Sequence, residues 1–315
     1  MNVHSALRPE REQAMKTILI TGATAGIGRH AALELVRQGH HVIATGRREP
    51  ALATLKAEAA TLSKTSGGRL DTLKLDVTDT ASVASAVTEV DTLTDGHGLD
   101  VLVNNAGYGQ MGPVEEVSDA DLRRQYDTNV FGLMSVTRAF LPKMRARGDG
   151  RIVNVGSIGG RYTFPLMGAY NSTKYAVESL SDALRNELAP FGVAVSIIEP
   201  GPIATEFNDR AMDTIDVSAF AGSAYEPVIA QAERFRKQFE ANSSGPEVTT
   251  RAIVHAALGR RPRVRYVVPR IAGLMLAILA FLPTRLVDFV MQRASGLTKK
   301  NLESRRPPAL GAPAA

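Results

Sequence analysis

The chain alternates between short apolar runs and longer stretches in which apolar positions recur every three to four residues. The short runs are rich in β-branched residues and do not alternate between apolar and polar positions, which is typical of parallel strands buried on both faces. We predict strands at 17–21, 41–45, 70–75, 100–104, 151–155, 193–198 and 265–268. Helical periods lie between them, for example at 27–38, 79–93, 118–146 and 168–189.

This regular alternation predicts an α/β fold: a doubly wound, Rossmann-like parallel sheet of about seven strands with helices on both faces. No repeat or long linker divides the pattern, so we expect one domain over 16–268. A polar interval at 203–245 interrupts the rhythm, and we expect an insertion there that covers the substrate. We also predict a helical extension at 269–303 and disordered tails at 1–15 and 304–315, which offer little to bury.

Composition and charge narrow the chemistry. The 315 residues contain no Cys, which excludes disulfides, thiolate nucleophiles and zinc–sulfur sites, and the six His show no metal-ligand spacing. The N-terminus lacks the apolar core of a secretory signal, which favours a cytoplasmic protein. Of the formal charge of +5, the stretch 260–306 carries about +9, with eleven basic residues against two acids. This stretch carries no known nucleic-acid-binding motif, so we expect no nucleic-acid binding.

The uncharged segment 271–284 in this basic region has fourteen residues, whereas a membrane span needs about 20. Three interpretations stay open: a buried helix, a contact between two copies of the chain, and a membrane-surface contact through 269–293. The flanking arginines, with Lys299 and Lys300, would suit anionic lipid headgroups. In the third case the protein would be peripheral at a membrane surface.

The first predicted strand leads directly into a glycine-rich turn, TGATAGIG at 21–28, and then into a helix. Gly22 suits the tight turn, Gly26 lets the backbone approach a pyrophosphate, and Gly28 permits close packing of helix and strand. The free amides at the helix start favour an anionic diphosphate, although a glycine-rich turn also occurs without a ligand. The residues of this turn expected to contact a dinucleotide are Gly22, Thr24, Gly26, Ile27 and Gly28.

The end of the second predicted strand, TGRR at 45–48, has no acid at its tip. An acid there usually accepts from the ribose 2′-OH of NAD, whereas a guanidinium suits the 2′-phosphate of NADP. Arg47 and Arg48 therefore predict NADP(H), with NAD(H) as the alternative. For one of the two arginines, the interpretation that it only caps a solvated turn stays open. Asp76 is a candidate acceptor for the adenine amino group, and the backbone of Val77 would complete that contact.

Tyr170 and Lys174 stand four residues apart in a helical stretch, so both lie on one helix face. A phenol has a reference pKa near ~10, and an adjacent ammonium would lower it towards neutrality. Ser157, just past the fifth predicted strand, would donate to a substrate oxygen while Tyr170 moves the proton. Asn129, polar within a core-like helix, would hold a backbone kink or a water leading to Lys174. Each of these signals alone is weak.

Two further turns follow predicted strands at the same sheet edge. NNAG at 104–107 would pin the neighbouring strand and form one wall of the cofactor cleft, and PGP at 200–202 is a rigid turn that would meet the nicotinamide carboxamide. The residues of these turns expected to contact the cofactor are Asn105, Ala106, Gly107, Pro200, Gly201, Ile203 and Thr205.

In their order and spacing these motifs resemble the short-chain dehydrogenase/reductase family over about 16–260. The resemblance implies that Lys174 also holds the nicotinamide ribose and that hydride passes directly between the nicotinamide and the substrate carbinol carbon. It further implies a catalytic tetrad of Asn129, Ser157, Tyr170 and Lys174. The motifs that carry it are TGATAGIG (21–28), LDVTD (75–79), NNAG (104–107), Asn129, Ser157, YNSTK (170–174) and PGPIAT (200–205).

The glycine spacing is similar to that of the single-domain branch of the family. The stretch 104–117 further resembles members that act on hydroxysteroids, retinoids and other lipophilic alcohols. One departure is Thr24-Ala25, where many NADP-binding relatives carry a basic residue. We therefore predict an oxidoreductase that interconverts a secondary alcohol and a ketone or aldehyde on a lipophilic substrate, and family habit suggests a homo-oligomer. The alternative is a non-catalytic dinucleotide sensor or scaffold. Apolar residues expected around the substrate are Tyr108, Met111, Phe164, Pro165, Leu166 and Met167.

Overall fold

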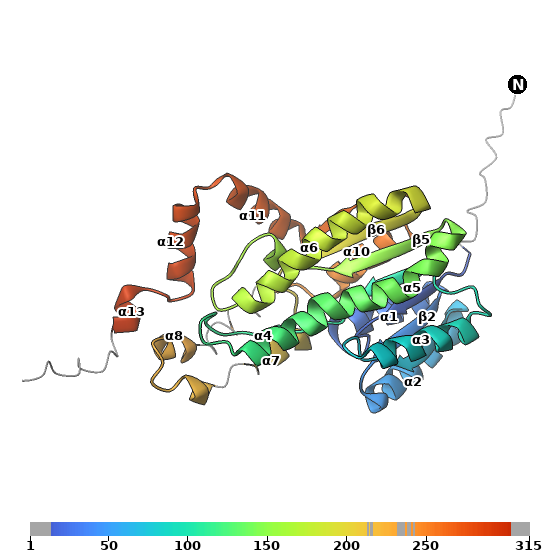
Figure 1. Ribbon diagram of the computed structural model, residues 1–315, viewed down its shortest axis with the longest axis horizontal. Coiled ribbons are helices and arrows are strands. Elements are labelled where there is room, and N and C mark those ends of the chain that lie inside the picture. Colours follow the sequence, from blue (N-terminus) through green and yellow to red (C-terminus); the bar gives the residue numbers. More distant parts are fainter. Residues whose placement is uncertain are drawn as a thin grey trace, which may run out of the picture.

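A computed structural model of the protein describes residues 14–212, 214, 217–231, 237, 241 and 243–303. Seven parallel strands form one sheet in the order β3-β2-β1-β4-β5-β6-β7 (Figure 1). Their bounds are β1 Thr17–Ile20, β2 His41–Gly46, β3 Arg69–Lys74, β4 Val101–Asn104, β5 Gly150–Val155, β6 Val193–Pro200 and β7 Arg265–Val268. The seven predicted strands are confirmed to within two residues. The predicted tails lie outside the described residues, apart from residues 14 and 15.

Helices cover both faces of the sheet, as predicted. Side chains alternate between the faces of a strand, so Ile18 and Ile20 pack into one core cluster while Leu19 packs into the other. The first cluster includes residues of α1 (Gly26–Arg37), α2 (Glu49–Ser66) and α10 (Glu247–Leu258). The second includes residues of α3 (Thr80–Leu93), α5 (Leu133–Arg147) and α6 (Gly168–Leu188).

The predicted helix at 118–146 is a continuous stretch of three parts. It begins with α4 (Asp119–Tyr126), passes through the π-helical turn η1 (Asp127–Gly132) and continues as α5. The hydroxyl of Ser118 accepts a hydrogen bond from the amide of Asp121 at 3.1 Å and caps the start of α4. A single π-helical turn inside an α-helix shifts the side chains that follow it, and such turns are often found at functional sites.

The order of the strands creates a crevice at the carboxyl edge of the sheet. β1 and β4 are neighbours, but the chain continues from β1 to β2 on one side and from β4 to β5 on the other. Open α/β sheets bind ligands outside the strand ends at such a switch point. Short helices near this edge are η2 (Ile158–Gly160), α7 (Glu206–Met212), η4 (Val217–Phe220) and α8 (Glu226–Ile229), while η3 (Ala189–Phe191) follows α6.

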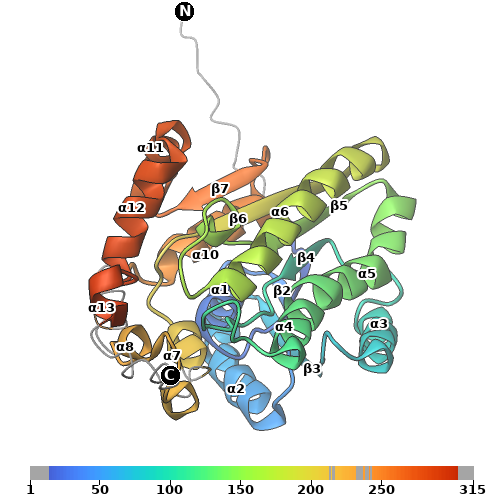
Figure 2. The same cartoon turned by 60° about the vertical axis from the view of Figure 1, so that its left-hand side comes forward.

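After β7 the chain forms three helices beside the sheet, drawn in red in Figures 1 and 2. They are α11 (Arg270–Phe281), α12 (Thr284–Ala294) and α13 (Lys299–Glu303). α11 contacts β7, and α13 contacts α8, so this segment reaches from the last strand to the short helices near the carboxyl edge (Figure 2). Within the described part of the chain, no helix has the length and apolar character needed to cross a bilayer.

Candidate active site

The glycine-rich turn lies directly after β1, at the switch point. Gly22 has a φ of +64°, and a Cβ there would lie 2.9 Å from the Cα of Ala106. A Cβ on Gly28 would lie 2.4 Å from Nδ2 of Asn105. The turn therefore excludes larger residues at both positions, because of its left-handed backbone at Gly22 and the close approach of the loop after β4 at both.

That neighbouring loop is tied to β1 by several hydrogen bonds. The side-chain amide of Asn105 donates to the carbonyls of Thr21 at 2.9 Å and Gly22 at 3.1 Å. The hydroxyl of Thr21 accepts from the backbone amides of Asn105 at 2.9 Å and Ala106 at 3.0 Å. The predicted pinning of the neighbouring strand is therefore present. Gly107 follows and lies beside the side-chain oxygen of Asn129.

A carboxylate lies at the start of α1. The backbone amide of Gly26 donates to Oε2 of Glu206 at 3.0 Å, and the β-carbon of Thr205 also lies close to Gly26. The amides at this helix start thus already hold an anionic group, which fits the site's expected preference for a diphosphate. Glu206 was missed by sequence reasoning, because it is 180 residues away from Gly26 along the chain.

The remaining predicted residues of the glycine-rich turn are Thr24 and Ile27. Thr24 faces β2, since a Cβ on Gly46 would lie 2.7 Å from its methyl group. Ile27 is partly buried against the core cluster beneath α1 and does not present a polar group. From the other side, Pro200, Gly201 and Ile203 form the turn after β6, where the amide of Gly201 donates to the carbonyl of Val268 at 2.7 Å.

A basic groove of about 580 Å³ lies at the ends of β2 and β3. Arg47 and Arg48 line it, together with Lys74, which pairs with Gly46 in the parallel register. Lys74 was not predicted, because its sequence position says nothing of this pairing, and its ammonium also lies 3.0 Å from a carboxylate oxygen of Glu49. Glu49 also lines the groove, so three cations outnumber one acid there, which suits a phosphate group.

Asp76 lies at the same edge, after β3. Its carboxylate accepts from the backbone amide of Thr78 at 3.0 Å and from the Thr78 hydroxyl at 2.7 Å. Burial raises the pKa of Asp76, but these hydrogen bonds and the charge of Arg47 outweigh it and hold the pKa below its usual value. The carboxylate is therefore ionised and can accept from an amino group. Val77 is buried beneath it, against Gly132.

Ser157, Tyr170 and Lys174 come together between β5 and α6. Ser157 directly precedes η2, where its hydroxyl accepts from the amide of Gly159 at 3.0 Å. The same hydroxyl lies close enough to the Tyr170 phenol to favour its ionised form, which lowers the pKa of Tyr170. The Lys174 ammonium donates to the carbonyl of Val155 at 2.8 Å and lies 5.6 Å from the centre of the Tyr170 ring.

Asn129 lies in the π-helical turn and is buried. Its side-chain amide donates to the carbonyl of Tyr108 at 3.0 Å and to the hydroxyl of Thr173 at 3.1 Å, while its oxygen accepts from the amide of Tyr108 at 3.2 Å. Asn129 thus joins the loop after β4 to the residue before Lys174. The sequence suggests two roles for Asn129: holding a backbone kink, or holding a water that leads to Lys174. Its position in a distorted helical turn fits the kink, and it reaches Lys174 only through the neighbouring Thr173.

Burial dominates the proton affinities at this site. It raises the pKa of Tyr170 to about 12, and the Ser157 hydroxyl opposes this only in part. Burial also lowers the pKa of Lys174 to about 8, although the charge of Glu178 one turn further along α6 favours the ammonium. Removal from water is thus the dominant influence on the pKa of Tyr170 here, and the expected lowering of that pKa by Lys174 stays a prediction.

The segment after β6 lies over this group. The ring of Phe207 in α7 is 5.6 Å from the ring of Tyr170, centre to centre. Further along, the hydroxyl of Thr214 accepts from the amide of Met111 at 3.0 Å, and the hydroxyl of Tyr225 donates to Glu115 at 2.5 Å. These described parts of the interval 203–245 thus rest on Tyr170 and on the loop after β4, which brings apolar side chains next to the phenol.

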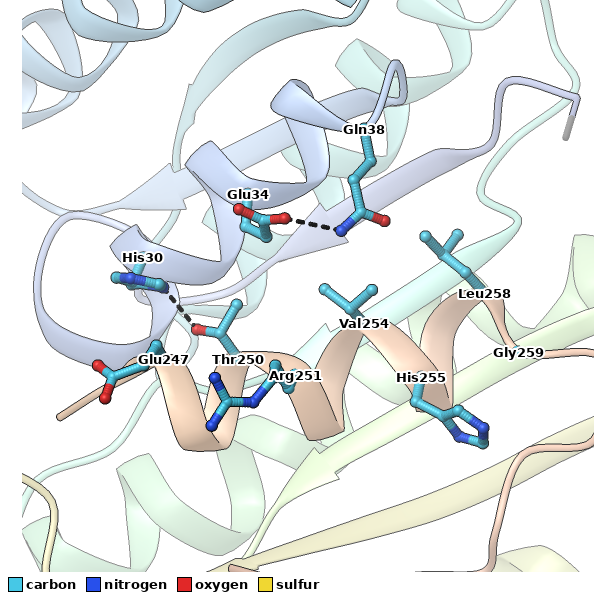
Figure 3. Close-up of a pocket in the computed structure, with 10 residues that line it drawn as sticks. All are labelled: His30, Glu34, Gln38, Glu247, Thr250, Arg251, Val254, His255, Leu258 and Gly259. Carbon is cyan, nitrogen blue, oxygen red and sulfur yellow. Dashed lines mark hydrogen bonds between the residues drawn. The ribbon is translucent and has the colours of Figure 1, made fainter. Parts of the chain in front are cut away.

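A second groove, of about 530 Å³, lies apart from this group between α1 and α10 (Figure 3). His30 and Thr250 are hydrogen-bonded across it at 2.8 Å, and Glu34 accepts from Gln38 at 2.8 Å. Neither Ser157, Tyr170 nor Lys174 is among the residues that line it. Because the groove lies away from these three residues, we place the active site at the carboxyl edge.

Curated proteins with related sequences are oxidoreductases. The chain is 36% identical to the uncharacterized oxidoreductase YbbO of Escherichia coli strain K12, over 88% of this chain and 94% of that protein. It is 31% identical to the NADPH-dependent 3-dehydrocapnine reductase of Ornithobacterium rhinotracheale, over 89% and 97%. It is 36% identical to the human 17-beta-hydroxysteroid dehydrogenase type 1, over 80% and 77%.

The fold agrees with these similarities. A short-chain dehydrogenase from Streptomyces avermitilis superimposes with a TM-score of 0.69 at 29% identity, and the match covers 91% of this chain and 99% of that one. The short chain dehydrogenase family model matches residues 16–216. The chain therefore belongs to the short-chain dehydrogenase family and is a dehydrogenase/reductase.

Proposed function

We propose that this protein is an NADP(H)-dependent oxidoreductase that interconverts a secondary alcohol and a ketone or aldehyde. One observation carries the proposal: Ser157, Tyr170 and Lys174 meet at the carboxyl edge of the sheet, the edge from which the glycine-rich turn also leaves β1. A nicotinamide cofactor held at that edge supplies or accepts the hydride. The protein's own groups then have to polarise the substrate oxygen and move one proton.

Tyr170 is the proton donor when a ketone is reduced. With its pKa raised to about 12, the phenol is protonated at neutral pH and can give its proton to the substrate oxygen as negative charge develops there. The Ser157 hydroxyl donates a second hydrogen bond to the same oxygen. Lys174 keeps its charge below a pH of about 8 and stabilises the phenolate that remains. In the oxidation direction the same phenolate accepts the proton.

Arg47, Arg48 and Lys74 support NADP(H) as the cofactor. Their groove would hold the 2′-phosphate, and the amides at the start of α1 would hold the diphosphate. Two observations support a diphosphate at the glycine-rich turn. The neighbouring loop leaves no room for a side chain at Gly22, and the Gly26 amide already donates to a carboxylate, that of Glu206. One relative is named as NADPH-dependent. NAD(H) is the alternative cofactor, since Thr24-Ala25 offers no basic residue in the glycine-rich turn.

A lipophilic substrate is supported by the apolar surroundings of the phenol. Phe207 lies against Tyr170, and a Cβ on Gly109 would touch both Phe207 and Ala211. Apolar side chains on both sides of a catalytic hydroxyl favour a substrate whose reacting carbon is carried on a hydrocarbon skeleton. A related protein is named for its action on a hydroxysteroid.

Replacing Tyr170 with Phe tests the mechanism, because it removes one oxygen from a buried ring and keeps the ring's packing. We expect kcat for NADPH-linked reduction of a panel of ketones to fall about 10²–10⁴-fold, the usual contribution of a general acid. NADPH binding, measured by its fluorescence, should change little. Undiminished turnover by the variant would refute the role of Tyr170. Tight NADPH binding by the wild-type protein without turnover of any substrate on the panel would instead favour a sensor or scaffold.

A further inference from the structure

The helices after β7 leave an unusual surface exposed. Eight of the fifteen exposed large apolar residues in the described part of the chain lie between 271 and 290, and the other seven are scattered from 15 to 264. We call this surface the outer face of α11 and α12. It consists of Ile271, Leu274, Ile278, Phe281, Leu282, Leu286, Phe289 and Val290.

The outer face follows from the spacing of its residues. In α11, positions 271, 274, 278 and 281 recur every three to four residues and so form one stripe. Phe281 is 89% exposed and Ile271 is 68% exposed, whereas Ala272 on the inner side is buried. In α12, Phe289 and Val290 are exposed while Val287 is buried. Both helices therefore pack against the protein with small or single residues and turn most of their apolar surface outward.

Charges around the outer face have one dominant sign. Arg270, Arg285 and Arg293 are exposed on α11 and α12, and the guanidinium of Arg293 lies 4.4 Å from the centre of the Phe289 ring. Lys299 and Lys300 follow at the start of α13. Asp288 is the one acid on α11 and α12, and after burial its charge is the next cause that raises the pKa of the Tyr162 phenol.

We propose that the outer face docks on the surface of an anionic lipid bilayer, with α11 and α12 in the interface and the basic side chains at the headgroups. Apolar stripes bordered by cations have this preference, because the apolar side chains leave water while the cations stay with the phosphates. The twelve residues of α11 are too few for a span, so the helices lie along the membrane and do not cross it.

Two other occupants fit the face less well. A second copy of the chain, related by a twofold axis, would bring the arginines of one outer face against those of the other, with Asp288 as the only acid on these helices to offset them. The C-terminal residues 304–315 contain one large apolar residue, Leu310, and two further arginines, so they have too little apolar surface to cover it.

Docking in this way would bring the bilayer near the entrance to the proposed substrate site. α13 contacts α8, which belongs to the segment lying over Tyr170, and Figure 2 shows the three C-terminal helices in a row that ends beside α8. A lipophilic substrate dissolved in the bilayer would then have a short route to Tyr170. The docking itself does not depend on the proposed function, and it can be tested without catalysis.

Flotation of the full-length protein with vesicles tests the proposal. The vesicles are phosphatidylcholine alone or phosphatidylcholine mixed with the anionic phosphatidylglycerol. We expect the wild-type protein to float with the anionic vesicles, and we expect Leu274→Ser/Phe281→Ser to lower the partition coefficient at least about tenfold. Phe191→Ser/Val264→Ser removes two exposed apolar side chains elsewhere and should float like the wild type.

A charge-reversal pair completes the test. Arg285→Glu/Arg293→Glu should abolish the preference for anionic vesicles, whereas Lys64→Glu/Arg123→Glu, at exposed positions away from the face, should leave most of it. Absence of wild-type binding to anionic vesicles, or unchanged binding of Leu274→Ser/Phe281→Ser, would overturn the proposal. So would light scattering that shows a wild-type dimer which this apolar variant converts to a monomer, because the face would then belong to a subunit contact.

Discussion

The two walls of the proposed cofactor cleft are built in different ways. The wall formed by the loops after β1 and β4 is held by main-chain and amide hydrogen bonds of about 3 Å around Thr21 and Asn105, and it excludes a side chain at Gly22. The opposite wall, formed by the turn after β6 and by α7, rests on Tyr170 through Phe207 and on the amide of Gly26 through Glu206.

The two walls therefore differ in how easily they can move. The first wall belongs to the sheet, so it cannot move unless strand contacts are lost. In the second, the turn after β6 is also held by the backbone, through the Gly201 amide and the carbonyl of Val268, whereas α7 reaches Tyr170 and Gly26 through the side chains of Phe207 and Glu206. Segments held by few contacts open at low free-energy cost. In the proposed function the first wall would fix where the cofactor binds, whereas α7 in the second would cover Tyr170. Substitutions in either wall, or in the residues between the walls, test this difference.

The largest effect is expected from Lys174, which is buried between the two walls and donates to the carbonyl of Val155 at the end of β5. Lys174→Met keeps the length of the side chain and removes its charge. We expect kcat to fall by about 10²–10⁴, since the phenolate loses its neighbouring cation. We expect the free energy of unfolding near neutral pH to be maintained or raised, because an ammonium whose pKa burial lowers to about 8 is costly to bury.

The pH dependence of stability checks the same residue. Between about pH 8 and 10.5 the lysine is protonated in the unfolded chain and neutral in the folded protein, so the unfolded state binds more protons. The free energy of unfolding should therefore rise with pH across this window in the wild type, relative to Lys174→Met. Urea denaturation at a series of pH values measures it, and parallel curves for the two proteins would contradict the burial of the charge.

Sequence reasoning predicted the wall formed by the loops after β1 and β4 far better than the opposite wall, formed by the turn after β6 and by α7. Runs such as those of β1 and β4 are buried on both faces, and their glycine and asparagine turns come directly after them, so local pattern located both strand and site. Lys74 joins the basic groove only through its register with Gly46 in the next strand. Glu206 and Phe207 reach Gly26 and Tyr170 through packing of a distant segment, and local pattern carries no information on such contacts.

An intermediate effect is expected in the basic groove, next to the fixed wall. Arg47→Ala should weaken NADPH binding by about 1.5–3 kcal/mol, the range for hydrogen bonds to charged groups, and should change NADH binding little. Lys74→Ala should act in the same direction, which would establish a role that sequence reasoning did not assign. Dissociation constants for both cofactors from fluorescence titration provide the measurement. Equal losses for NADPH and NADH would contradict a 2′-phosphate site.

The smallest effect is expected from Glu206, where the movable wall touches the fixed one. Its carboxylate accepts from the Gly26 amide at 3.0 Å, the donor that a diphosphate would use, so the two anions compete for one helix start. Glu206→Gln removes the charge and should tighten NADPH binding by a factor of about three to ten, equivalent to roughly 1 kcal/mol. Asp209→Asn, an acid-to-amide change in the same helix, is the matched control. Weaker binding by Glu206→Gln alone would mean that the carboxylate orders the cover around the cofactor and does not compete with it.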